Sequence, residues 1–156
     1  MLRTLEADIS AVRLDGKEVP IKLRVFDSLF VPLAKWSMLL TGNYRCILAN
    51  GARPIKEAVH SDIDAASKIY DWVNELARKI GADPADQVPF EKYAAAAENL
   101  LKPSSAARAI EAGVPFIERV DKVVQTTAQA FGMQLDAVDD IVKTVNARLA
   151  ANQSNA

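Results

Sequence analysis

The sequence is poor in cysteine and in long apolar runs. Cys46 is the single cysteine among 156 residues, which excludes an intramolecular disulfide and favours a reducing compartment. No apolar segment approaches the roughly 18–20 residues that span a bilayer. The first residues, MLRTLEADIS, lack the basic segment followed by an apolar run that marks a signal peptide. These absences predict a cytoplasmic protein that does not cross a membrane.

An excess of charge of one sign is also missing. The chain has 19 Lys and Arg against 20 Asp and Glu, mixed along its length, for a formal net charge of −1. It therefore lacks the basic stripe that neutralises nucleic-acid phosphates. The six glycines are scattered, and none has the GxGxxG spacing of a dinucleotide-binding turn. His60 has no second histidine or cysteine at a metal-ligand spacing, so we expect a solvated surface histidine. We expect no nucleic acid, nucleotide cofactor or metal.

Helical periodicity is what the sequence does contain. At 17.0 kDa the chain has the size of a single domain, residues 1–156. Apolar residues recur at three- and four-residue steps, and Gly or Pro ends most of these runs. The final run contains the stripe Val138, Ile141, Val142, Val145 and Leu149. We predict a mainly α, multi-helical bundle with its core in residues 33–150 and a frayed tail over 151–156. The six expected helices span residues 32–51, 55–80, 90–101, 103–113, 115–131 and 136–150.

Residues 1–25 have a different pattern, which predicts a β-hairpin. The sequence VPIKLRV, residues 19–25, alternates apolar with polar residues as a half-buried strand does. Asp15-Gly16 before it suits a two-residue type I′ turn, which would place Arg13 opposite Glu18. Because an isolated hairpin is barely stable in water, its apolar face must pack on the helices or on another subunit.

The stretch Pro103–Val124, PSSAARAIEAGVPFIERVDKVV, predicts two helices joined by a tight corner. Ser104 or Ser105 would cap the first helix, and Gly113 would end it. Pro115 would occupy the first turn of the second helix, where its missing N–H is harmless. The expected core-facing stripe of that helix is Phe116, Val120, Val123, Val124 and Phe131.

This order of a Ser-Ser pair, a short helix, a Gly-x-Pro corner and an Ile-Glu-x-x-Asp start to a long helix resembles the C-terminal helical domain of ketopantoate reductases. That domain belongs to the group of helical folds similar to the C-terminal domain of 6-phosphogluconate dehydrogenase. The resemblance covers roughly residues 36–148. In the family, a Rossmann domain binds NADPH and the helical domain closes over the ketoacid. The resemblance therefore implies a helical domain standing alone, without a hydride source.

The family's helical domain supplies a lysine that gives a proton to the substrate carbonyl oxygen. Alignment on Trp36 places Met38 at that position, and a thioether has no proton to give. Lys35 lies three residues from Met38 and could occupy a nearby face. The family's asparagines fall at Gly42 and Cys46. Asn43 is one residue from Gly42, about 100° around a helix, and would replace it only after a register shift.

Three further positions match the family better. Its serine pair, which holds the substrate carboxylate, aligns with Ser104 and Ser105. Its acid, which binds the substrate hydroxyl, aligns with Glu118, one residue later than the commonest spacing. The structural alternative is that the serines only cap a helix and Glu118 only favours a helix N-terminus. The candidate substrate-binding residues are Asn43, Ser104, Ser105 and Glu118, and no residue is assigned as catalytic.

The sequence supports two main hypotheses. The first is a non-catalytic, stand-alone relative of this domain that forms a homodimer and binds a small carboxylate. Apolar surface that a Rossmann partner normally covers would then be buried by self-association. The second is the substrate-binding half of a split or truncated NADPH-dependent ketoacid reductase that needs a separate Rossmann-domain protein. A third interpretation, a helical core with an unrelated partner, stays open.

Overall fold

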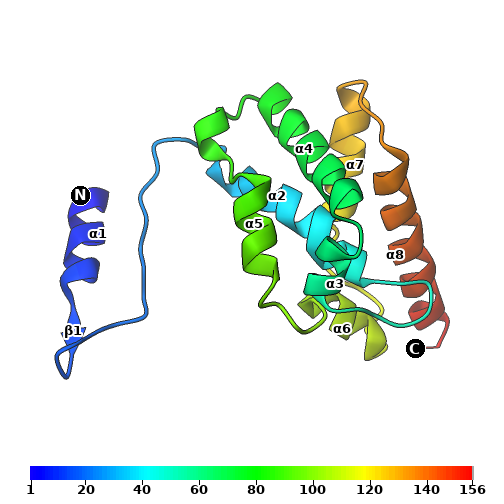
Figure 1. The fold of residues 1–156 in the computed structure, drawn as a ribbon, viewed down its shortest axis with the longest axis horizontal. Coiled ribbons are helices and arrows are strands. Elements are labelled where there is room, and N and C mark those ends of the chain that lie inside the picture. Colours follow the sequence, from blue (N-terminus) through cyan, green and yellow to red (C-terminus); the bar gives the residue numbers. More distant parts are fainter. Residues whose placement is uncertain (156) are drawn as a thin grey trace.

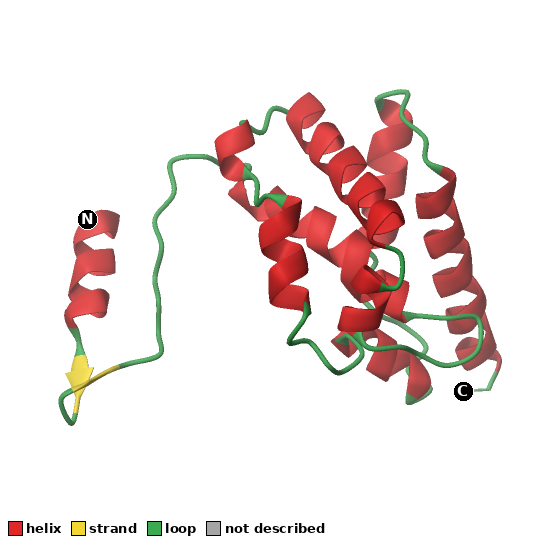
Figure 2. Ribbon diagram, in the orientation of Figure 1, coloured by secondary structure: helices red, strands yellow, loops and turns green. Residues whose placement is uncertain are grey.

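The computed structural model describes residues 1–155 and confirms a mainly helical chain with a small antiparallel hairpin near its N-terminus (Figures 1 and 2). None of the described helices is long and apolar enough to cross a membrane. In chain order the helices and strands are α1 (Leu2–Ala11), β1 (Arg13–Leu14), β2 (Lys17–Glu18), α2 (Ala34–Met38), α3 (Ile55–His60), α4 (Ile63–Ile80), α5 (Phe90–Ala97), α6 (Ser105–Glu111), α7 (Val120–Ala130) and α8 (Asp136–Ser154).

A continuous helical segment of changing pitch, residues 31–46, forms the centre of the bundle and is called the rod below. A 3₁₀ turn, Val31–Leu33, leads into α2, a π-helical segment, Leu39–Asn43, comes next, and a second 3₁₀ turn ends at Cys46. The helix expected over residues 32–51 is thus confirmed only as far as Cys46. Ile47 then forms an isolated bridge with Ala52. The rod packs against α3, α4, α6 and α7, as Figure 1 shows.

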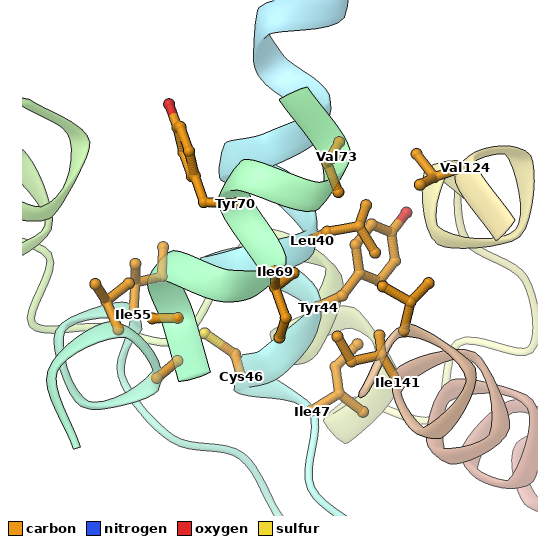
Figure 3. Packing of buried hydrophobic residues seen from close by; sticks show 14 of the residues in the cluster. Leu40, Tyr44, Cys46, Ile47, Ile55, Ile69, Tyr70, Val73, Val124 and Ile141 are labelled. Atoms are coloured by element: carbon orange, nitrogen blue, oxygen red, sulfur yellow. The ribbon is translucent and has the colours of Figure 1, made fainter. Parts of the chain in front are cut away.

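The core forms where this rod meets the surrounding helices (Figure 3). Leu40 and Tyr44 of the rod face α4 and α7, and Tyr70 of α4 stacks on Tyr93 of α5 at a ring-centroid distance of 5.5 Å. Each fully buried aliphatic side chain contributes about 1.5–3 kcal/mol of transfer free energy. The labelled members of the cluster in Figure 3 are Leu40, Tyr44, Cys46, Ile47, Ile55, Ile69, Tyr70, Val73, Val124 and Ile141.

The single helix expected over residues 55–80 is two helices, α3 and α4. Asp62 has an extended backbone conformation, which separates the two helices, and its side chain accepts a hydrogen bond from the Ala65 amide at 2.9 Å. The stop at Gly81 is confirmed, with φ at +123°. The helix expected over residues 90–101 ends early, at Ala97.

The prediction that Pro115 begins a helix is wrong. Residues 115–119 are not helical, and α7 starts at Val120. Its buried face contains Asp121, Val124 and Ala128, whereas Phe116 is 74% exposed. Two hydrogen bonds from Arg119, of 2.9 and 2.7 Å, hold the buried Asp121 carboxylate. The expected stripe is therefore correct at Val124, only partly buried at Val120, and wrong at the exposed residues Phe116, Val123 and Phe131.

The last helix is confirmed, and its expected stripe is buried at all five positions. The frayed tail is wrong for residues 151–154, because α8 continues to Ser154; Ala156 lies outside the described residues. Asn152 donates to the carbonyls of Ile110 and Val114 at 2.9 and 3.0 Å, so this end of α8 is held by the corner after α6.

The N-terminal prediction is correct in its turn and wrong in its extent. β1 and β2 pair with Arg13 opposite Glu18, as expected. Residues 19–25 form no strand, and residues 2–11 form the unexpected helix α1. No residue of α1 is buried, and α1 with the hairpin stands apart from the bundle, joined to it by an extended segment (Figure 1). Among the described residues the hairpin therefore does not pack on the helices of the bundle, and its packing on another subunit stays a prediction.

Candidate functional site

A cavity of about 300 Å³ lies where the central rod, the start of α6 and the chain before α7 meet. Three of the four predicted site residues, Asn43, Ser105 and Glu118, line it. Asn43 lies 62 residues before Ser105 in the sequence, and Glu118 follows Ser105 after the corner between α6 and α7, so the fold brings the three together. Its other lining residues are Leu39, Tyr44, Ala106, Ala109, Ile117 and Val120.

The π-helical segment explains how Asn43 reaches this cavity. A π-turn adds one residue to a helical turn, which shifts the register of the residues after the turn. Gly42 is consequently buried against Tyr93, and Asn43, the next residue, lines the cavity. Asn43, the last residue of the π-helical segment, is thus the residue of this turn whose side chain lines the cavity.

The two serines have different roles. Ser104 is buried, is absent from the cavity lining, and its hydroxyl accepts from the Ala107 amide at 3.1 Å and donates to the Asn43 carbonyl at 2.8 Å. It caps α6 and ties that helix to the rod. Ser105 is the first residue of α6, is exposed, and lines the cavity. The capping alternative therefore holds for Ser104, whereas Ser105 is free to meet a ligand.

Tyr44 sets the position of Glu118, a role that the sequence pattern did not reveal. The Tyr44 hydroxyl donates to the Glu118 carbonyl at 2.6 Å and accepts from the Val120 amide at 2.9 Å. Burial raises the pKa of this phenol, so it stays protonated and able to donate. The rest of the Tyr44 side chain is buried in the core, and a buried tyrosine hydroxyl usually finds a hydrogen-bond partner.

The polar side chains of the cavity share one property. Among the described residues, the side chains of Asn43, Ser105 and Glu118 have no hydrogen-bond or ion-pair partner, and the remaining wall is mostly aliphatic. Small-molecule sites typically combine an apolar wall with a few convergent polar groups. Glu118 is the single charged residue of this lining.

The positions aligned with the family's proton donor and asparagines cannot perform those roles. Met38 is partly buried, and its carbonyl accepts from the Tyr93 hydroxyl at 3.1 Å. A Cβ added at Gly42 would lie 1.9 Å from that hydroxyl, so an asparagine would not fit. Cys46 is fully buried, and desolvation raises its thiol pKa. Lys35 is exposed and absent from the lining.

No metal centre is present in residues 1–155, which contain no group of three or more His, Cys, Asp or Glu side chains able to hold an ion. His60, expected to be solvated, is instead partly buried, with its Nε2 3.0 Å from the Ala94 carbonyl and 3.4 Å from Glu98. These two contacts account for the position of the His60 ring without a metal ligand role.

Comparison of the chain with family models, with curated proteins and with solved structures finds no match. The resemblance to the ketopantoate reductase helical domain therefore stays a prediction, which depends on the serine pair, the Gly-x-Pro corner and the Ile-Glu-x-x-Asp sequence.

Proposed function

We propose that this chain is a non-catalytic relative of the ketopantoate reductase C-terminal domain that binds a small carboxylate in the cavity of Asn43, Ser105 and Glu118. The observation that carries the proposal is the convergence of three polar side chains without partners on one mostly apolar cavity. The Ser105 hydroxyl and the Asn43 amide supply donors for a carboxylate. Glu118 supplies an acceptor for a donor group elsewhere on the ligand.

The absence of a proton donor at Met38 supports binding without catalysis. Reduction of a ketoacid needs a proton at the carbonyl oxygen and a hydride at the carbon. The Met38 thioether cannot give the first, and Lys35 lies outside the lining. The sequence contains no glycine-rich turn for a cofactor that would give the second. We expect no ketoacid turnover by this chain with NADPH.

Calorimetric titration of ketopantoate tests the site. We expect heat of binding with the native chain and none, up to millimolar ligand, with Ser105→Ala or Glu118→Ala. Glu91→Ala, on the exposed start of α5, is the matched control and should bind normally. Circular dichroism melting of each variant checks folding. Equal binding by all variants, or no heat with the native chain, contradicts the proposed site.

Self-association is the second part of the proposal, and exposed apolar side chains support it. Phe116, Val123 and Phe131 occur along or beside α7 with exposed fractions of 74%, 50% and 46%. A contiguous exposed apolar patch usually marks an interaction site, and we propose that these three side chains form one. A symmetric homodimer would cover this surface in both copies at once.

The alternative function, the substrate-binding half of a split ketoacid reductase, is favoured by one separate observation. Residues 19–27 are extended, alternate in polarity over 19–25, and make no backbone ladder with another described segment. Such a segment can add to the edge of a partner's sheet. This alternative predicts turnover of ketopantoate and NADPH only when a separate Rossmann-domain protein is mixed with the chain. No turnover in that mixture contradicts it.

A further inference from the structure

We propose that the ligand of this cavity is zwitterionic, a small α-amino acid with a branched aliphatic side chain, and that Glu118 binds its ammonium group. The inference rests on the proposed binding site and specifies the ligand class beyond a carboxylate. It depends on the charge of the lining, on the hydrogen bonds that Arg119 already makes elsewhere and on the apolar wall.

The lining has one formal negative charge and no positive charge. A ligand with a carboxylate alone would bring a second negative charge into a cavity of about 300 Å³ beside Glu118. Two like charges in a partly desolvated space repel one another, which offsets part of the hydrogen bond that Glu118 offers to a hydroxyl group of the ligand. An ammonium group on the same ligand removes this conflict, because it pairs with Glu118 while the carboxylate meets Ser105 and Asn43.

Among the described residues, the lining of this cavity contains no Lys or Arg to neutralise a simple carboxylate. Arg119 comes directly after Glu118 in sequence, but its guanidinium binds both oxygens of Asp121 and the Asn146 amide oxygen. Arg119 lines a different hollow, against α8. Lys35 is exposed and outside the lining. The favourable charge must therefore come from the ligand.

The wall defines the rest of the ligand. Ala106 and Ala109 of α6 share the cavity lining with the side chains of Leu39 and Ile117. These groups offer no donor or acceptor, so a polar ligand body would lose hydrogen bonds with water and gain none. A short branched aliphatic body fills such a space and gains from the removal of its surface from water.

A matched pair of probes tests the inference. L-valine and L-2-hydroxyisovalerate share one skeleton and differ by an ammonium in place of a hydroxyl group. By calorimetry we expect the native chain to bind L-valine at least about tenfold more tightly, since its ammonium group forms an ion pair with the Glu118 carboxylate that a neutral hydroxyl group cannot form. Glu118→Gln keeps the size of the side chain and should abolish the preference, whereas Glu118→Asp should retain part of it. Ser105→Ala should weaken both probes equally.

The outcomes separate this inference from the proposed function. Binding of L-2-hydroxyisovalerate or ketopantoate that equals or exceeds that of L-valine overturns the amino-acid assignment and leaves a carboxylate site. A preference for L-valine that persists in Glu118→Gln also overturns it. Absence of heat with all three probes, for a chain that melts cooperatively, overturns both. Because Glu118 is exposed and its side chain bonds to no described residue, its substitution should leave the fold intact.

Discussion

The Tyr93 side chain packs so closely against Gly42 that there is no room for a side chain at position 42. The Tyr93 hydroxyl occupies the space of a side chain at Gly42, and it donates to the Met38 carbonyl. We expect Gly42→Ala to lower the free energy of unfolding by about 1–3 kcal/mol, because the added methyl group would force Tyr93 out of its place. Urea unfolding followed by circular dichroism measures the change.

A second substitution makes this expectation specific. Tyr93→Phe removes the oxygen that the new Cβ would strike, so Gly42→Ala should be clearly less destabilising in the Tyr93→Phe chain than in the native chain. Equal losses in the two backgrounds would show that Tyr93 is not the obstacle. The same contact explains why Asn43, and not residue 42, supplies a side chain to the cavity.

Tyr70 should make the stability of the protein sensitive to alkaline pH. Burial raises its pKa to about 12 from the ordinary value of 10.0. Between these two pKa values the phenol of the folded state keeps a proton that the phenol of the unfolded state has lost, so unfolding releases a proton. The contribution of Tyr70 to the free energy of unfolding is therefore complete below pH 10 and is lost as the pH rises to 12. Burial also raises the pKa of Tyr93, so both residues act in the same direction.

The urea midpoint at pH 7, 9, 10 and 11 measures this dependence. We expect a nearly constant midpoint up to pH 9 and a fall above pH 10. Tyr70→Phe, which removes one of the titrating groups, should be less stable at pH 7 and show a shallower fall. An unchanged midpoint from pH 7 to 11 would mean that these phenols ionise as freely in the folded chain as in the unfolded chain.

At the scale of elements, local signals predicted the ends of α4, α6 and α7, each of which is followed by a glycine. Gly81, Gly113 and Gly132 each adopt positive φ beyond a helix end, a conformation that glycine reaches without strain. The buried stripe of α8 was also predictable, because one long helix packs a single face on the core. These features depend on the residues of one segment, which is why the sequence reveals them.

Elements that depend on distant partners were not predictable. Pro115 suits a first helical turn, yet the Tyr44 hydroxyl holds Glu118 and Val120 and delays the start of α7. Residues 19–25 alternate like a strand but have no partner strand, since the chain before the hairpin forms α1. For the site, the resemblance selected Asn43, Ser105 and Glu118, whereas the clamp by Tyr44 depends on a contact 74 residues away.

The break between α3 and α4 leads to a prediction at the same scale. The apolar periodicity continues across residues 61 and 62, so the stripe alone concealed the break, whereas Asp62 is a favoured cap residue. Asp62→Ala should lower the free energy of unfolding by about 1 kcal/mol, because the Ala65 amide loses its acceptor. Lys68→Ala, an exposed change within α4, is the control and should stay within about 0.5 kcal/mol of the native chain. Equal effects in urea unfolding would contradict a capping role.

At the scale of the whole molecule, most of the large exposed apolar residues, eleven of fifteen, are concentrated at two locations. Eight of the fifteen large exposed apolar residues lie in residues 1–29, in α1, the hairpin and the extended segment, and three others lie along or beside α7. The α7 residues belong to an element whose opposite face is fixed in the core, so their burial against a partner needs little ordering. The N-terminal segment would have to order a long extended linker as well (Figure 1). The proposed homodimer would therefore form through the α7 side and leave the N-terminal segment available to a different partner.

Light scattering coupled to size-exclusion chromatography, over a range of loading concentrations, tests this assignment. We expect a mass of twice 17.0 kDa. Phe116→Glu and Val123→Glu should each produce a monomer, because a charge at the centre of an apolar contact leaves an unpaired ion buried in the dimer. Leu5→Glu, a comparable change in α1, should leave the dimer intact.

A dimer that is abolished by Leu5→Glu and unaffected by the α7 substitutions would place the interface at the N-terminal segment. A native chain that is monomeric at every concentration would refute the homodimer, and one that aggregates on concentration would favour the split reductase, because its apolar surface would then lack its covering partner.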